Sequence, residues 1–293
     1  MTAAIRRPAV AGSWYPGAAT ALAAAVDRYL SGAPRDVDGE LVALVAPHAG
    51  LMYSGPVAAH AYRLLRDRRF DVAVLVGPSH FVGFDGVAVY GSGGFETPFG
   101  VAAVDEECAA ILLTATPVVR ENAVPHAREH SLEMQLPFIQ HLAPAAKIVP
   151  LVMGYQTAST ARALGDALAS ALDGRRALLI ASTDLSHYHD AATAAELDAV
   201  VIDHVKRFDA DGLQHALDAR PEHACGGGPT VAVMRAAKAL GARDAVVLDY
   251  ADSGDVSGDK SAVVGYLAAA FGNFNRETRD DEALQQGAEK RPR

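Results

Sequence analysis

Cysteine is scarce in this chain, and its scarcity excludes one class of small extracellular fold. The 293 residues include only two cysteines, Cys108 and Cys225. Two cysteines cannot build the framework of disulfides that stabilises small secreted domains. Each cysteine must therefore be interpreted from its sequence neighbours.

Positive charge is also in deficit. Lysine and arginine together number 26 against 35 aspartates and glutamates, which gives a formal net charge of -9 at pH 7. No stretch concentrates basic residues as a nucleic-acid or anionic membrane surface would require. We therefore expect neither nucleic acid nor a membrane as a partner.

Long apolar runs are the third absence. No run approaches the roughly 18 to 20 apolar residues that span a membrane. The first residues, MTAAIRRPAVAGSWYPG, carry two arginines but no apolar segment of signal-peptide length. The sequence predicts a globular, cytoplasmic protein.

What the chain does contain is many short apolar segments, within a composition that is 50% hydrophobic. Short, β-branched segments that are apolar throughout are typical of strands covered on both faces. Such segments occupy residues 40–47, 71–78, 86–92, 147–154, 176–183, 245–253 and 261–271. Helical periodicity occupies residues 18–30, 55–67, 104–114, 129–142, 158–172, 191–208 and 227–240.

This alternation of strands and helices predicts an α/β fold, in which a mostly parallel or mixed central sheet carries helices on both faces. No internal repeat or linker interrupts it, so we expect a single domain over residues 1–271. Residues 272–293 are charged and lack apolar periodicity, which predicts a disordered tail.

Reactive side chains follow several predicted strands. His48 and His80 each come just after an apolar strand, and STDLSHYHD follows another strand. Cys225, in CGGGP, lies at a predicted helix start. Because ligands of open α/β sheets bind at the carboxyl ends of the strands, these residues can converge on one site.

A single histidine after a strand is most often a surface or capping residue, but His48 and His80 share one sheet edge. Two imidazoles and one anionic ligand are a set that holds a redox-active divalent metal. Cys225 is the candidate third ligand, because a helix N-terminus and glycine amides should lower the pKa of its thiol. The alternative is that Cys225 is a small buried hydrophobe, a description that Cys108 fits well.

Six motifs in a fixed order carry a family resemblance. They read AGSWYP, APHAGLMYSGPVAAHAY, GPSH, EHSLEMQLPF, STDLSHY and CGGGP. Together they resemble the MEMO family, whose prokaryotic members are called AmmeMemoRadiSam system protein B, over about residues 8 to 271. The resemblance implies a fold similar to that of class III extradiol ring-cleavage dioxygenases.

The resemblance also implies a metal site, with iron or copper as the cofactor. In the family, the positions matching His48, His80 and Cys225 form this site, and those matching Asp184 and His187 lie beside it. The dioxygenases hold ferrous iron with two histidines and a glutamate, whereas cysteine replaces the glutamate here. A thiolate ligand favours tight binding of Cu(I) over the ring-cleavage reaction of the iron enzymes, because soft sulfur suits the softer ion.

The residues Asp184 and His187 have roles that the sequence leaves open. Beside a metal, His187 can act as a general acid or base. Asp184 either fixes the tautomer of His187 or approaches the metal directly.

REHSLEMQLPFIQHL has an apolar stripe that predicts a helix, kinked at Pro137. We expect Glu129 and His130, at its N-terminal end, to orient a ligand imidazole by hydrogen bonding. Glu133 is a weaker candidate for the same role. The alternative is a core-facing helix with a polar end.

Two functions of different class follow. One is a metal-dependent, dioxygenase-like oxidoreductase that acts on an unknown small substrate. The other is a non-catalytic protein that sequesters metal or binds a partner. The resemblance implies a radical SAM protein and an AMMECR-type protein as partners. A serine hydrolase is disfavoured, because no nucleophile-elbow glycines flank Ser186.

Overall fold

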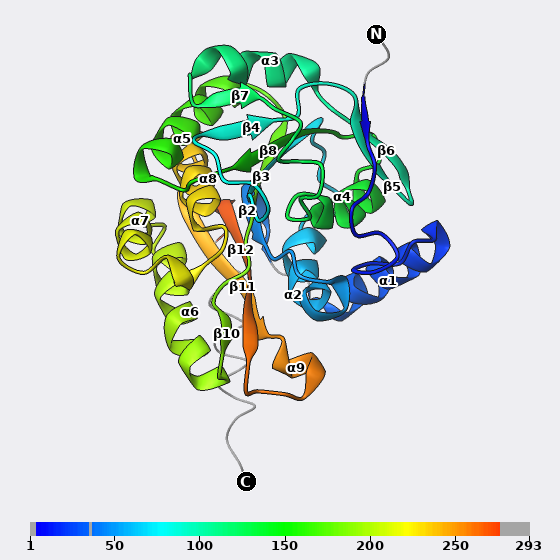
Figure 1. The fold of residues 1–293 in the computed structure, drawn as a ribbon, viewed down its shortest axis with the longest axis vertical. Helices are drawn as coiled ribbons and strands as arrows, with labels where there is room; N and C mark the ends of the chain where they lie inside the picture. Colours follow the sequence, from blue (N-terminus) through cyan, green and yellow to red (C-terminus); the bar gives the residue numbers. More distant parts are fainter. Residues whose placement is uncertain (1–3, 35–36, 276–293) are drawn as a thin grey trace.

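A mixed nine-stranded sheet runs through the centre of the molecule (Figure 1). The structure is a computed structural model and describes residues 4–34 and 37–275. Helices cover both faces of the sheet, so the α/β fold predicted from the sequence is confirmed. Among the residues that the structure describes, no helix combines the length and the apolar character needed to cross a membrane.

Four parallel strands form the centre of this sheet. In spatial order they are β2 (Gly39–Ala46), β9 (Ala177–Ser182), β3 (Val72–Pro78) and β8 (Lys147–Met153). Their register pairs Ala46 with Ser182 and Val76 with Ala181, so their carboxyl ends lie at one edge. This edge is where the sequence places the reactive residues.

Antiparallel and short strands complete the sheets. On one side, β12 (Val263–Phe274) pairs with β2 and also with β11 (Asp244–Asp252) and β10 (His187–His189). On the other side, β4 (Val87–Val89) pairs with β8, and β7 (Val119–Glu121) pairs with β4. A separate sheet contains β1 (Ile5–Arg6), β5 (Gly94–Thr97) and β6 (Gly100–Ala103).

The helices lie on both sides of the central sheet. Those named α1 to α5 are Ala19–Gly32, Leu51–Arg63, Glu106–Ala115, Leu136–Leu142 and Ala158–Leu172. Those named α6 to α9 are Ala191–Lys206, Ala210–Ala219, Gly227–Ala239 and Gly254–Ser257. Short 3-10 turns are η1 (Glu133–Gln135) and η2 (Pro221–His223).

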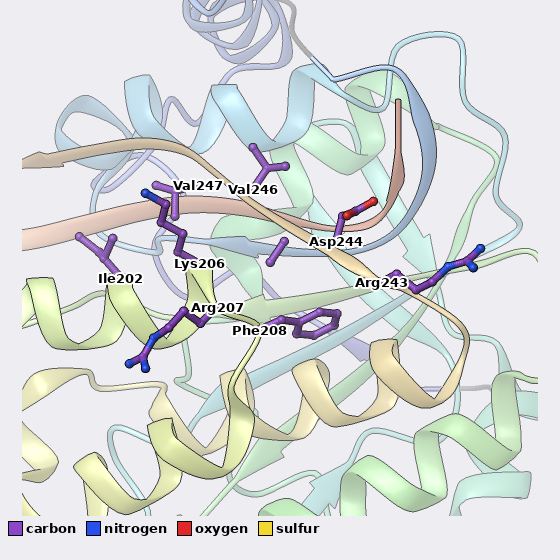
Figure 2. Close-up of a pocket in the computed structure, with 9 residues that line it drawn as sticks. Ile202, Lys206, Arg207, Phe208, Arg243, Asp244, Val246 and Val247 are labelled. Atoms are coloured by element: carbon purple, nitrogen blue, oxygen red, sulfur yellow. The ribbon is translucent and has the colours of Figure 1, made fainter. Parts of the chain in front are cut away.

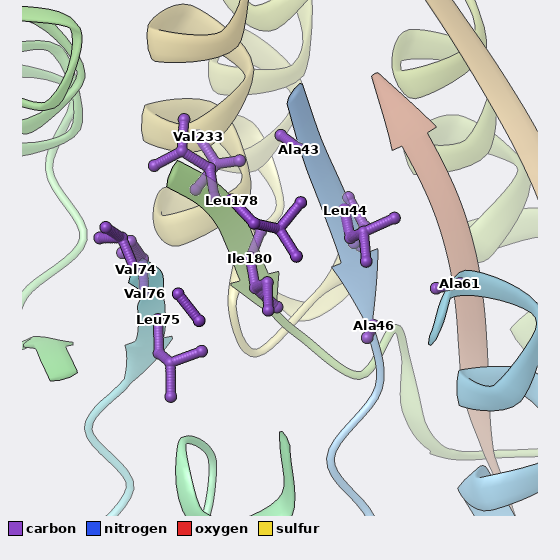
Figure 3. Packing of buried hydrophobic residues seen from close by; sticks show 14 of the residues in the cluster. Ala43, Leu44, Ala46, Ala61, Val74, Leu75, Val76, Leu178, Ile180 and Val233 are labelled. Atoms are coloured by element: carbon purple, nitrogen blue, oxygen red, sulfur yellow. The ribbon is translucent and has the colours of Figure 1, made fainter. Parts of the chain in front are cut away.

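The core forms because the central strands are apolar on both faces. Leu44, Val74 and Ile180 project from neighbouring strands into one packed cluster, which Val233 of α8 also joins (Figure 3). All four side chains are fully buried. Burial of this kind stabilises a fold by about 25 cal/mol for each Å² of apolar surface removed from water.

Two predicted boundaries are wrong. The helix predicted from residue 129 begins only at Glu133, and Pro137 does not kink it. Pro137 lies in the first turn of α4, where a missing N–H costs no hydrogen bond. The apolar strand β12 continues to Phe274, three residues into the predicted tail, while residues 276–293 lie outside the described part of the chain.

A buried ion pair fixes the N-terminal segment to the segment before α4. Arg6 and Glu133 form this pair, and both side chains are almost completely buried. The Glu133 carboxylate also accepts hydrogen bonds from the backbone of Ala9 and Val10 and from the Tyr15 hydroxyl. Its negative charge is therefore compensated by donors from one segment of the chain.

Replacing Glu133 should destabilise the protein strongly. We expect Glu133→Ala to lower the free energy of unfolding by about 3 to 5 kcal/mol, because it leaves the Arg6 charge buried without its partner. Urea denaturation measures the change. Asp71→Ala is the control, since it removes an exposed pair with Arg176 and should cost less than about 1 kcal/mol. Equal losses in the two variants would contradict the prediction.

Candidate metal centre

Three residues that are far apart in the sequence converge at the carboxyl edge of the central sheet. One ligand atom each from His48, His80 and Cys225 lies within 4.8 Å of the others. The Cys225 sulfur is 3.2 Å from Nε2 of His48. The His48 and His80 rings meet edge to face, with their centroids 5.2 Å apart. The structure thus brings together the three residues that the sequence groups as ligands.

The strand order explains this convergence. His48 follows β2 and His80 follows β3, and β9 lies between these two strands. Cys225 reaches the same edge because Gly226 packs against the end of β9 and donates its N–H to the Thr183 hydroxyl, at 2.9 Å. A Cβ atom at Gly226 would lie 2.3 Å from the Ser182 carbonyl oxygen, so only glycine fits this contact.

The carboxylate of Glu129 holds the His80 side chain and its backbone. One carboxylate oxygen is 2.9 Å from Nδ1 of His80, and the other accepts the His80 backbone N–H at 2.6 Å. The backbone N–H groups of His130 and Ser131 also donate to this carboxylate. Burial alone would raise the pKa of Glu129, but the hydrogen bonds from His80 and Ser131 outweigh it and lower the pKa to about 2.

His48 is held differently. Its Nδ1 lies 2.8 Å from the Ser182 hydroxyl, and its backbone N–H donates to the Asp184 carboxylate at 2.7 Å. Burial and the neighbouring imidazole of His80 lower the pKa of His48 well below its ordinary value. In both histidines Nδ1 is occupied, so Nε2 is the nitrogen left for a ligand.

Asp184 lies beside His48. One of its oxygens is 4.0 Å from Nε2 of His48, and burial raises the pKa of Asp184 to about 7. The ring of His187 is instead hydrogen-bonded to the backbone of Leu185, and burial lowers its pKa. The Asp184 carboxylate thus contacts His48, and both roles that the sequence leaves open for Asp184 stay predictions.

The thiol of Cys225 does not have the lowered pKa expected from the sequence. Burial raises its pKa, and the nearby carboxylate of Asp184 raises it further. The backbone N–H of Asp184, 3.3 Å from the sulfur, compensates only in part. The expectation is wrong because the sequence shows the glycines and the helix start but not the depth of burial.

His130 and Glu133, the other predicted orienting residues, have different surroundings. The His130 ring stacks on that of His80, with centroids 4.6 Å apart, and burial lowers the pKa of His130 to about 4. His80, Glu129 and His130 form a second group with ligand atoms close together. The expectation for Glu133 is corrected, since its carboxylate is used by Arg6 and Tyr15.

A cavity of about 560 Å³ lies near the cluster but is lined by none of His48, His80 and Cys225. Its lining includes the aromatic residues Trp14, Tyr53 and Tyr188. The Trp14 ring lies 4.4 Å from that of His130, and the Tyr188 ring lies 5.6 Å from that of His187. Trp14 and Tyr188 thus separate this cavity from His130 and His187, whereas Cys225 itself lines a different pocket, of about 350 Å³.

A second pocket, of about 580 Å³, is separate from the cluster. It lies where the end of α6 meets β11, and its lining combines Phe208 with Lys206 and Arg243 (Figure 2). None of the clustered histidines or Cys225 lines this pocket.

Sequence reasoning missed three residues of the site. Ser182 contacts His48, Gln135 contacts Ser182, and Trp14 contacts His130. Ser182 and Gln135 are fully buried polar residues. A polar residue at the end of an otherwise apolar strand was the signal for Ser182, while Gln135 and Trp14 occur within motifs already noted for other residues.

The chain is thus an α/β protein with a mixed central sheet and a histidine, histidine and cysteine cluster at the carboxyl edge of that sheet. The sequence model described as Memo-like protein matches residues 6–270. The chain belongs to this family, which confirms the resemblance recognised from the six motifs.

Curated relatives agree with this assignment over nearly their whole length. A MEMO1 family protein of Methanosarcina mazei is 42% identical over 267 residues, which cover 90% of this chain and 98% of the relative. A MEMO1 family protein of Methanopyrus kandleri is 39% identical, with coverage of 91% and 98%. An uncharacterized Escherichia coli K12 protein, JW3007, has a similar fold, with a TM-score of 0.53 at 15% identity over 80% of this chain and 100% of that chain.

The loop that carries Glu129 also contains a buried histidine, His126, that should make stability depend on pH. Nε2 of His126 contacts the Ala88 carbonyl at 3.0 Å, and burial lowers the pKa of His126 to about 4. The native ring therefore stays neutral in a pH range where the unfolded chain, with an ordinary value of 6.5, takes up a proton. Stability is then lost as the pH falls from 6.5 to about 4.

Replacing His126 should flatten this pH dependence. We expect His126→Gln, which keeps an N–H donor for Ala88, to reduce the loss of unfolding free energy between pH 6.5 and 4 by up to about 3 kcal/mol. Urea denaturation of both proteins across this range measures the difference. Parallel stability curves for the wild type and the variant would refute the prediction.

Proposed function

We propose that this protein binds one ion of iron or copper through His48, His80 and Cys225. The observation that carries the proposal is the convergence of two imidazoles and one thiol within 4.8 Å. Imidazole nitrogen and thiolate sulfur together suit these metals better than magnesium or calcium, which prefer oxygen ligands.

The surroundings of the three side chains fit such an ion. Glu129 and Ser182 occupy Nδ1 of the two imidazoles, in the way that outer partners orient metal-binding histidines. The half-buried thiol of Cys225 holds its proton because desolvation and the nearby Asp184 carboxylate raise its pKa. The positive charge of a bound cation would oppose both effects and displace the proton.

We further propose that the bound ion serves redox chemistry on a small molecule in the nearby cavity. An iron or copper ion would supply one-electron chemistry. His187, half-buried beside the cluster, would donate or accept a proton. Trp14 and Tyr188 would form the aromatic walls that hold the substrate.

The alternative is a metal-binding protein without turnover, which acts with a radical SAM protein and an AMMECR-type protein as the family resemblance implies. The thiol of Cys225 favours this alternative if the ion is Cu(I), because soft sulfur binds Cu(I) tightly. Oxygen consumption with electron-rich aromatic compounds separates the two functions. An enzyme would consume oxygen and lose this activity in His187→Ala with its metal retained, whereas a carrier would consume none.

Removing one ligand should abolish stoichiometric metal binding. We expect the anaerobically reconstituted wild type to hold about one iron or copper ion per chain, since the site offers three donors and open positions. His48→Ala and Cys225→Ser should lose it, as measured by inductively coupled plasma mass spectrometry.

Two variants serve as matched controls for this experiment. His215→Ala removes an exposed histidine, and Cys108→Ala removes the other thiol, which is buried in the core. Both should keep their metal. Full metal content in His48→Ala and Cys225→Ser, or no metal in any sample, would exclude the proposed site.

Glu129 should set the affinity of the site without being a ligand itself. We expect Glu129→Gln to weaken metal binding by about 10- to 100-fold, because an amide cannot accept all the hydrogen bonds that hold His80. Competition with a chelator of known affinity measures the change, and circular dichroism checks the fold. An unchanged dissociation constant in the folded variant would show that Glu129 does not support His80 as a ligand.

A further inference from the structure

A buried row of polar side chains lies behind His48. The Tyr62 hydroxyl donates to the Gln135 side-chain oxygen at 2.6 Å, and the Gln135 nitrogen donates to the Ser182 hydroxyl at 2.7 Å. Ser182 in turn contacts Nδ1 of His48 at 2.8 Å and the Ser131 carbonyl at 2.6 Å. Tyr62, Gln135 and Ser182 are fully buried, and His48 is 1% exposed.

The orientation of the Gln135 amide is fixed by a proline carbonyl. The atom placed as the Gln135 nitrogen lies 3.1 Å from the carbonyl oxygen of Pro47. A carbonyl oxygen can only accept a hydrogen bond. The group facing Pro47 and Ser182 must therefore be the NH₂ group, and the amide oxygen faces the Tyr62 hydroxyl.

The direction of the Ser182 hydroxyl follows in the same way. Its oxygen lies 2.6 Å from the Ser131 carbonyl oxygen, and two oxygens at this distance repel each other unless a hydrogen lies between them. The single hydroxyl hydrogen must therefore point to Ser131. The lone pairs that remain accept from Gln135 and face Nδ1 of His48.

We infer that Gln135 and Ser182 are positioning residues that hold His48 as its Nδ1–H tautomer. With both hydroxyl lone pairs accepting, Nδ1 of His48 is the donor. Nε2 then carries the lone pair, and it is this nitrogen that lies 3.2 Å from the Cys225 sulfur. The expected effect of these two residues on metal affinity rests on the proposed function, whereas the assignment of the tautomer is independent of it.

The imidazoles of His48 and His80 therefore donate to hydrogen-bond acceptors of different charge. Nδ1 of His80 contacts the carboxylate of Glu129, and His80 keeps a side-chain exposure of 26%. Nδ1 of His48 contacts a neutral hydroxyl at a position that excludes water. A neutral acceptor holds the tautomer of a fully buried imidazole without placing a second uncompensated charge in the interior.

Long-range nitrogen–proton NMR of the metal-free protein tests the tautomer directly. We expect His48 of the wild type to show the Nδ1–H pattern. Ser182→Ala removes the acceptor and should let both tautomers appear. Gln135→Met has a similar volume without polar hydrogens, and it removes one of the two donors to the Ser182 oxygen, so that the Ser131 carbonyl alone holds the direction of the hydroxyl. Ser54→Ala, which removes a buried hydroxyl bonded to the Ala49 carbonyl, is the matched control.

Anaerobic titration with Fe(II) and Cu(I) tests the consequence for affinity. Ser182→Ala should weaken binding by about 10- to 100-fold, as loss of an orienting partner of a ligand imidazole does elsewhere. Gln135→Met should weaken it less, and Ser54→Ala should leave it unchanged.

The outcomes separate this inference from the metal proposal. An Nε2–H pattern for His48 in the wild type would overturn the inference, as would Ser182→Ala with wild-type tautomer and affinity. The Nδ1–H pattern in a protein that binds no metal would support the tautomer and reject the metal site. If Ser182→Ala does not fold, the wild-type spectrum and Gln135→Met decide the question.

Discussion

The register of β2 against β9 is the constraint on which the site depends. Because Ala46 pairs with Ser182, β2 and β9 end at the same level of the sheet. His48, two residues after the end of β2, therefore lies beside Ser182 and Asp184. A shift by one residue would turn every side chain of β2 to the opposite face of the sheet. The apolar side chains on both faces of these strands resist that shift through their packing, so the hydrophobic core and the ligand cluster specify the same register.

Charge is balanced locally at this edge of the sheet. Three imidazoles lie within 6 Å of one another by their ring centroids, the largest separation being 5.6 Å between His48 and His130. The neighbouring imidazoles and burial lower the pKa of His48, and burial lowers that of His130, while backbone and side-chain donors stabilise the Glu129 carboxylate. Two neutral imidazoles near an anionic carboxylate leave this edge receptive to a cation.

The α/β fold and the set of clustered residues could be predicted because strands and strand ends have local sequence signals. His48 and His80 follow apolar strands, and parallel strands bring such positions to one edge. The contacts of Glu133 could not be predicted, because its partner Arg6 lies 127 positions away in the sequence. The raised pKa of the Cys225 thiol depends on burial by residues from several elements, and the short strand β10 has too few residues to show a period.

The separation of the clustered residues along the chain has a consequence for how the protein is made. His48 and His80 emerge early from the ribosome, whereas Cys225 follows His48 by 177 residues. Any ion captured during translation first meets imidazoles alone, and the sulfur arrives only after most of the sheet has been synthesised. Closing a loop of that length carries an entropic penalty that grows only slowly with its size. The soft donor thus joins last of the three, after the four parallel strands of the sheet and before α8, β11 and β12.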